Sequence, residues 1–162
     1  MTDMIRRASF SRCGQYRYAL WREWDSTLPQ VLFIGLNPAT ADAEKEDNTM
    51  RRCLYYAKSW GYGSMAVGNL FAFRTTWPTE LKKASDPVGK YNDRWLGKLS
   101  VNANLVVAMW GNDGSFLGRA GKVIRRFPDL HCFKLTAQGQ PHHTRGLPNG
   151  LKPRPLGIIK NE

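Results

Sequence analysis

The segment QVLFIGLNPATAD, residues 30–42, changes character halfway along its length. Its first part, 30–36, is a continuous apolar run of the kind found in a β-strand that is covered on both faces. The run stops at Gly35 and Leu36, and Asn37, Pro38 and small residues follow. An asparagine in this position suits either a turn ahead of a proline or the wall of a crevice at the end of a strand.

Segments of the same apolar kind recur along the chain and alternate with segments of helical periodicity. Buried strands are expected from residue 64, over 104–111 and over 130–135, an edge strand over 16–24, and helices over 48–60, 92–102 and 116–127. This alternation predicts a three-layer α/β/α fold with a mainly parallel central sheet of about four or five strands. We expect a single domain over residues 1–162, with its core in about 16–150.

The chain is strongly basic. Lys and Arg number 24 against 13 Asp and Glu among 162 residues, so the formal net charge is +11. Between residues 119 and 154, eight basic side chains accompany a single acid, Asp129. Such a concentration favours a polyanionic partner such as nucleic acid, although a soluble protein with a basic surface has the same composition.

Several common kinds of site find no support in the sequence. Cys13, Cys53 and Cys132 are widely spaced, and no cysteine and histidine cluster has the spacing of a zinc site. Neither G-x-G-x-x-G nor a P-loop motif is present. No apolar run reaches the ~18 residues that suggest a membrane span. We therefore expect a cytoplasmic monomer that binds no membrane and uses neither a metal nor an organic cofactor.

Four motifs resemble a bacterial and phage family of unknown function: LNPATAD (36–42), DNTMRRC (47–53), GYGSMAVGNLFAFRTT (61–76) and GQPHH (139–143). The same motifs are more remotely similar to the uracil-DNA and thymine-DNA glycosylase superfamily. There, one strand ends in G-I-N-P-G, the next in T-N with R-T-T beyond it, and a late loop holds H-P-S. Residues 35–38 match the first motif and 68–76 the second, whereas the late loop, 139–148, lacks the H-P-S triplet.

This resemblance implies a uracil-DNA-glycosylase-like fold and the removal of an altered base from DNA. Breaking the C–N glycosidic bond makes the sugar positive and the departing base negative. Asn37 would hold the attacking water through its side-chain carbonyl, since an amide cannot act as a general base. Asp42 is a candidate to activate that water, and either His142 or His143 would donate a hydrogen bond to the base oxygen.

Recognition of the extruded base would fall to side chains near the strand ends. Asn69 offers both donors and an acceptor to a base edge, or else caps a loop. Phe71 and Phe73 point to one face, where one of them stacks on the base or both belong to the core. Asn48 and Trp110 are further candidates for the wall of the pocket.

Contacts with the DNA backbone are expected from basic and hydroxyl side chains. Leu147 or a neighbouring arginine would fill the gap that base extrusion leaves. The expected DNA-binding residues are Arg74, Thr75, Arg145, Lys152 and Arg154.

Two functions of other classes remain open. The chain could bind nucleic acid without catalysis, because a shared fold does not guarantee shared chemistry. It could also be a metal-dependent hydrolase or transferase in which Asp42 and Asp47 hold Mg²⁺, although Asp and Asn ahead of a helix are more often its caps.

Overall fold

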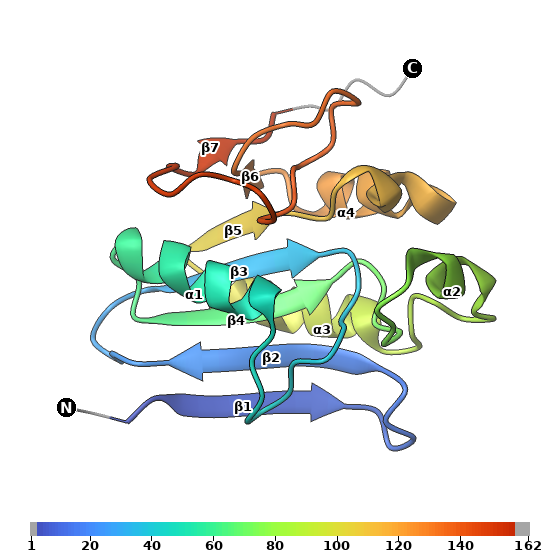
Figure 1. Cartoon of the computed structure of the whole chain (residues 1–162), viewed down its shortest axis with the longest axis horizontal. Helices are drawn as coiled ribbons and strands as arrows, with labels where there is room; N and C mark the ends of the chain where they lie inside the picture. Colours follow the sequence, from blue (N-terminus) through green and yellow to red (C-terminus); the bar gives the residue numbers. More distant parts are fainter. Residues whose placement is uncertain (1–2, 158–162) are drawn as a thin grey trace.

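The computed structural model describes residues 3–157, which form one mixed sheet of seven strands with four α-helices (Figure 1). The strands are β1 (Ile5–Phe10), β2 (Arg17–Glu23), β3 (Gln30–Gly35), β4 (Ser64–Asn69), β5 (Leu105–Ala108), β6 (His131–Cys132) and β7 (Arg154–Pro155). The α-helices are α1 (Asn48–Ser59), α2 (Pro78–Lys83), α3 (Asn92–Val101) and α4 (Arg119–Arg126), and a 3-10 segment, η1, spans Asn112–Gly118. The chain is thus a mixed α/β protein, as the alternating pattern predicts.

The sheet is larger than the four or five strands expected, and only its centre is parallel. Its strand order is β1-β2-β4-β3-β5-β6-β7. The strands β4, β3, β5 and β6 run parallel, whereas β1, β2 and β7 pair antiparallel with their neighbours. The segment 16–24 was expected at an edge, but β1 covers β2 on its outer side.

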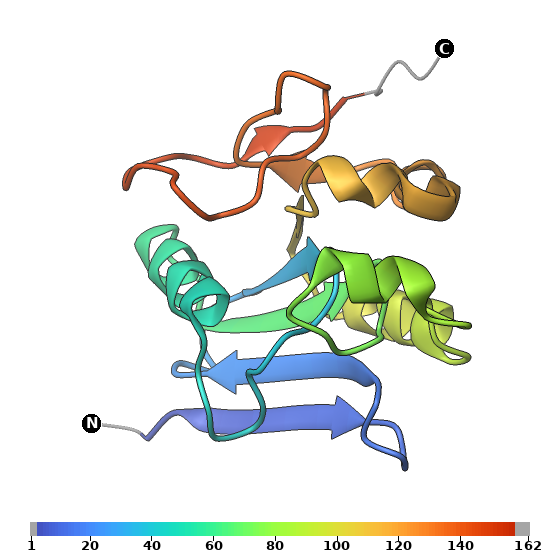
Figure 2. The same ribbon diagram turned by 45° about the vertical axis from the view of Figure 1, so that its right-hand side comes forward.

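Helices cover both faces of this sheet. Along β3, Val31 and Phe33 pack in one hydrophobic cluster with residues of α1, while Leu32 and Ile34 pack in another with residues of α3 and α4. Figure 1 shows α1 crossing one face of the central strands, and the turned view in Figure 2 separates it from α3 and α4. Because β3 is buried on both faces, its continuous apolar run is explained.

The helix α1 begins and ends close to the predicted limits. Its N-cap is Asp47, whose Oδ1 accepts a 2.9 Å hydrogen bond from the backbone N–H of Met50. The buried residues Met50, Cys53 and Ala57 follow the helical spacing that identified the segment. The predicted helix 116–127 instead starts at Arg119, because Leu117 has a left-handed backbone with φ of 56°.

The carboxyl ends of the parallel strands meet at one edge of the sheet. After β3 the chain crosses to β4 on one side, and after β4 it crosses back over β3 to reach β5 on the other side. The binding crevice of an open α/β sheet lies where the strand order reverses in this way. Within residues 3–157, no helix is long and apolar enough to cross a membrane.

Candidate functional site

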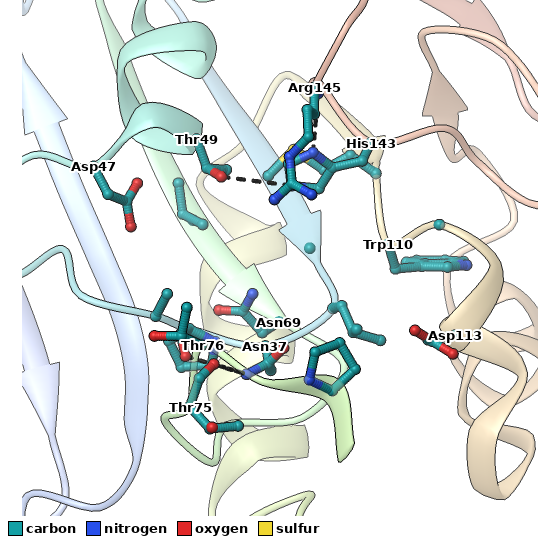
Figure 3. A pocket seen from close by; sticks show the side chains of 18 of the residues that line it. Asn37, Asp47, Thr49, Asn69, Thr75, Thr76, Trp110, Asp113, His143 and Arg145 are labelled. Atoms are coloured by element: carbon teal, nitrogen blue, oxygen red, sulfur yellow. Dashed lines mark hydrogen bonds between the residues drawn. The ribbon is translucent and has the colours of Figure 1, made fainter. Parts of the chain in front are cut away.

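A cavity of about 440 Å³ opens at this edge of the sheet. Its volume lies within the range of about 300–1,000 Å³ that is usual for ligand sites. Its wall is built by the segments that follow β3, β4, β5 and β6, together with the start of α1 (Figure 3). Of the predicted site residues, the cavity is lined by Asn37, Asn69, Thr75, Trp110, His142, His143 and Arg145.

Asn37 holds the loop at the end of β3 and faces the cavity at the same time. Its Nδ2 donates to the backbone carbonyls of Thr75 at 2.8 Å, Pro38 at 3.2 Å and Phe73 at 3.3 Å. Its Oδ1 accepts no hydrogen bond from any residue between 3 and 157. The two interpretations of this residue are therefore compatible: the nitrogen fixes the turn and leaves the oxygen for a ligand or a water.

Asn69 ends β4 with a buried amide that the protein does not satisfy. The residue is 4% exposed, and its Oδ1 is buried without a partner among the described residues. A Cβ at Gly35 would lie 3.0 Å from Asn69 Nδ2, so the glycine makes room for this amide. Asn92 donates to the carbonyls of Asn69 and Leu70 and fixes the backbone there. An unsatisfied buried amide is costly, and a ligand in the cavity would relieve that cost.

His143 reaches the cavity from the loop that follows β6. Its Nδ1 accepts a 2.9 Å hydrogen bond from the backbone N–H of Arg145, and its Nε2 lies 3.5 Å from Thr49 Oγ1. Burial, with the charge of Arg145 and the neighbouring His142, lowers the pKa of His143 to about 4. The side chain is therefore a neutral imidazole at physiological pH, with its proton on Nε2.

Trp110 forms a rigid aromatic wall beyond β5. It is 2% exposed, and its Nε1 donates a 3.0 Å hydrogen bond to Gln140 Oε1. His142, on the same late loop, directs its Nδ1 to its neighbour's carbonyl oxygen at 2.6 Å. Both side chains are thus held by the loop of residues 139–143, which the sequence identified as a motif.

The structure also adds residues that the sequence interpretation missed. Arg17 of β2 is 2% exposed and lines the cavity, as does Thr49 at the start of α1. Asp47, which the sequence suggested as a metal ligand or a helix cap, lines it too. Thr76 and Pro78 line it as well, and between them the side chain of Trp77 is 62% exposed. In the sequence, the one feature that points to Arg17 is that a charged residue stands in a largely apolar strand segment.

A family model described as a protein of unknown function (DUF1643) matches residues 17–144. The chain belongs to the DUF1643 family. The match begins at Arg17 and ends one residue after His143, so it includes every cavity residue described above except Arg145. No curated protein and no solved structure matches the chain.

Within the family region, the two phenylalanines are core residues, which is one of the two alternatives left open for them. Both belong to the hydrophobic cluster that also contains residues of α3 and α4, and neither lines the cavity. Phe71 is fully buried with its ring 5.5 Å from that of Phe116, and Phe73 packs its ring edge on Tyr16. The alternation of the two phenylalanines with Ala72 does not show whether their rings face the cavity or the core. Their role in base stacking is not supported.

Asn48 and Asp42 also lie outside the cavity. Asn48 is exposed at the first turn of α1, where its Oδ1 accepts a 2.8 Å hydrogen bond from Arg51. Asp42 Oδ1 accepts from the backbone N–H groups of Glu44 and Lys45, and these bonds lower the pKa of its carboxyl group. A carboxylate held in a local turn does not reach a water at Asn37.

Asp47, considered for a metal, and the neighbouring Glu46 are both occupied by other groups of the protein. Asp47 accepts from the N–H groups of Met50 and Ala41, as expected for a helix cap. Glu46 pairs with Arg22 at 2.7 Å and with Arg6. In the part of the chain that the structure describes, no three His, Cys, Asp or Glu side chains form a group suited to a metal ion.

The five residues expected to contact DNA lie in three different places. Arg145 and Thr75 line the cavity, whereas Lys152 and Arg154 are exposed near β7 and do not. Arg74 donates to the carbonyl of Gly14 and lies 4.7 Å over the ring of Phe10, so it supports the β1–β2 connection beside the cavity. Leu147 is 8% exposed and packs in the core with α1, so it does not fill the gap left by an extruded base.

Proposed function

We propose that this protein is a DNA glycosylase that hydrolyses the bond between an altered base and its sugar, on a three-layer fold similar to that of uracil-DNA glycosylase. The observation that supports this is a meeting of three groups in one cavity: the free carbonyl of Asn37, the buried amide of Asn69 and the neutral imidazole of His143. They come from three different segments, the loop after β3, the end of β4 and the loop after β6, and suit a polar ligand with several hydrogen-bonding groups (Figure 3).

Each group has a distinct part in the reaction. A water held by Asn37 Oδ1 attacks the sugar carbon C1′, while the C–N bond breaks and its electron pair leaves with the base. The Nε2–H of His143 donates to an oxygen of the base, where negative charge develops. Asn69 pairs with the base edge, and the flat ring of Trp110 forms a wall of the pocket. The water's proton passes to solvent or to the released base, since no carboxylate among residues 3–157 is hydrogen-bonded to Asn37.

The mouth of the cavity suits a nucleic acid. A base must leave the duplex to enter such a pocket, so the rim has to hold the strand on both sides. Arg145 brings a positive charge to the cavity, and the exposed indole of Trp77 offers a stacking surface beside it. The net charge of +11 favours association with the phosphate backbone.

Base release tests the proposal directly. Oligonucleotides that each carry one modified base, in single- and double-stranded form, are incubated with the protein, and hot alkali then cleaves any abasic product. We expect release of at least one base by the wild type, and a loss of about 100-fold or more with Asn37→Ala. Asp42→Asn, which changes a carboxylate outside the cavity, serves as the matched control and should retain activity. Tight binding with no release across the panel would instead identify a non-catalytic binder.

A further inference from the structure

Among residues 3–157, three arginines are almost completely buried, and one of them forms no ion pair with a carboxylate of this region. Arg22 is 0% exposed and pairs with Glu46 at 2.7 Å, and Arg119 is 3% exposed and pairs with Asp93 at 2.9 Å. Arg17 is 2% exposed, yet no carboxylate among residues 3–157 lies within ion-pair distance of it. A buried charge without a partner is expensive, so Arg17 calls for a separate explanation.

An irregularity in β2 turns Arg17 toward the cavity. Ser9 pairs with Ala19 and Phe10 with Arg17, so Tyr18 is an extra residue in the strand. Ala19 packs in the core with α3, and Tyr18 stacks on Trp95 of the same helix. Arg17 therefore points to the opposite face, where its Nη1 donates a 3.0 Å hydrogen bond to the carbonyl of Ala41. Bulges of this kind often re-aim a side chain next to an active site.

The bond to Ala41 leaves part of the guanidinium unsatisfied. Arg17 Nε is buried and has no partner in the described part of the chain. The opposite charge that acts on Arg17 most is that of Asp47, but this carboxylate already accepts from two backbone N–H groups. Arg145 adds a second positive charge to the cavity, while the charge of Asp113 is balanced by Lys82 at 3.1 Å. The cavity therefore has a positive end at Arg17.

We infer that Arg17 forms a subsite for an anion, and that the altered base which enters the cavity carries a carboxylate or a similarly anionic substituent. This assignment of the substrate class depends on the proposed function. A guanidinium binds a carboxylate through charge-assisted hydrogen bonds, which are about twice as strong as neutral ones. A ligand anion would supply the counter-charge that the chain does not provide, and neutral bases would leave Arg17 unpaired.

Binding of free bases tests the subsite without requiring catalysis. The probes are two matched pairs: 5-carboxyuracil with uracil, and 7-carboxy-7-deazaguanine with 7-deazaguanine, titrated by calorimetry. We expect the wild type to bind the anionic member of at least one pair about tenfold or more tightly than the neutral member. Arg17→Gln should abolish this preference, and Arg17→Lys should keep part of it.

Arg22→Gln is the matched control. Arg22 lies on the same strand and the same face as Arg17 and also donates to a loop carbonyl, that of Asp42, but it does not line the cavity. This variant should keep the preference and lose thermal stability, because the buried ion pair with Glu46 is broken and that carboxylate keeps only its contact with Arg6. Arg17→Gln should be as stable as the wild type or more so, since it removes an unpaired charge. Equal binding of both members of each pair, no binding of any probe, or a preference that survives in Arg17→Gln would overturn the subsite.

Oligonucleotides that carry the same four bases separate this inference from the proposed function. If the free anionic base binds through Arg17 and no base is released from any oligonucleotide, the subsite stands and the glycosylase proposal fails. If neutral bases are released as fast as anionic ones, by the wild type and by Arg17→Gln alike, the glycosylase proposal stands and the subsite fails.

Discussion

The backbone N–H of Arg145 donates a 2.9 Å hydrogen bond to Nδ1 of His143. A ring nitrogen that accepts a hydrogen bond does not carry a proton, so the neutral ring holds its proton on Nε2. Protonating Nδ1 would turn this bond into a clash between two N–H groups, and burial adds a further cost to the charged form. Burial and the charges of Arg145 and His142 lower the pKa of His143 to about 4, and the bond at Nδ1 makes the neutral ring a hydrogen-bond donor of fixed tautomer.

The rate of base release should be independent of pH between about pH 5 and 8. His143 has an ordinary pKa of about 6.5 when exposed, but in the folded protein it stays neutral until the pH falls toward 4. Single-turnover rates across this range measure the effect. A step in the rate centred near pH 6.5 would show that a histidine with an ordinary pKa controls the reaction, contrary to the structure.

Stability should fall in acid because of the same residue. The pKa of His143 is lower in the folded than in the unfolded chain, so its contribution is complete above about pH 6.5. Between that pH and the folded value of about 4, only the unfolded chain takes up the proton, and the free energy of unfolding decreases. Urea denaturation of the wild type and of His143→Gln at pH 7 and pH 4.5 tests this. The variant should lose less stability between the two pH values, and an equal loss would contradict the assignment.

Two buried asparagines should respond in opposite ways to substitution. Asn69→Ala removes an amide whose Oδ1 has no partner in the described region, so stability should change by no more than about 1 kcal/mol while base release is lost. Asn92→Ala removes hydrogen bonds of 2.9 and 3.0 Å to the carbonyls of Asn69 and Leu70, and should cost about 1–3 kcal/mol. Thermal denaturation and the alkali assay measure both effects. A large destabilisation by Asn69→Ala would make that residue structural.

The central part of the fold could be predicted from the sequence because its signals are local. The apolar run of 30–35 and the helical spacing from Met50 onward each lie within one element, and the structure places β3 and α1 there. Asn37 and Asn69 could be assigned to one edge because parallel strands present their carboxyl ends together.

The remaining features depend on contacts between distant segments. The strand β1 contains Arg6 and Arg7 and lacks an apolar run, and it forms because β2 offers it a partner. The orientation of Arg17 depends on the extra residue in β2, which shows only in the register with β1. Phe71 and Phe73 alternate in the sequence, but their place in the core depends on Phe116 and Tyr16, which lie far from them along the chain.

The exposed indole of Trp77 should matter for DNA binding and not for folding. Because the residue is 62% exposed, replacing it with alanine removes little buried surface, and the melting temperature should stay within a few degrees of the wild-type value. Trp77 lies between Thr76 and Pro78, which both line the cavity, and stacking of a base on an aromatic ring contributes about 1–3 kcal/mol. The affinity for oligonucleotides should therefore fall about 5- to 150-fold in a fluorescence anisotropy titration at fixed salt. Tyr91→Ala is the matched control, since this aromatic residue is 46% exposed and does not line the cavity. Equal affinities of the two variants would exclude Trp77 from the DNA-binding surface.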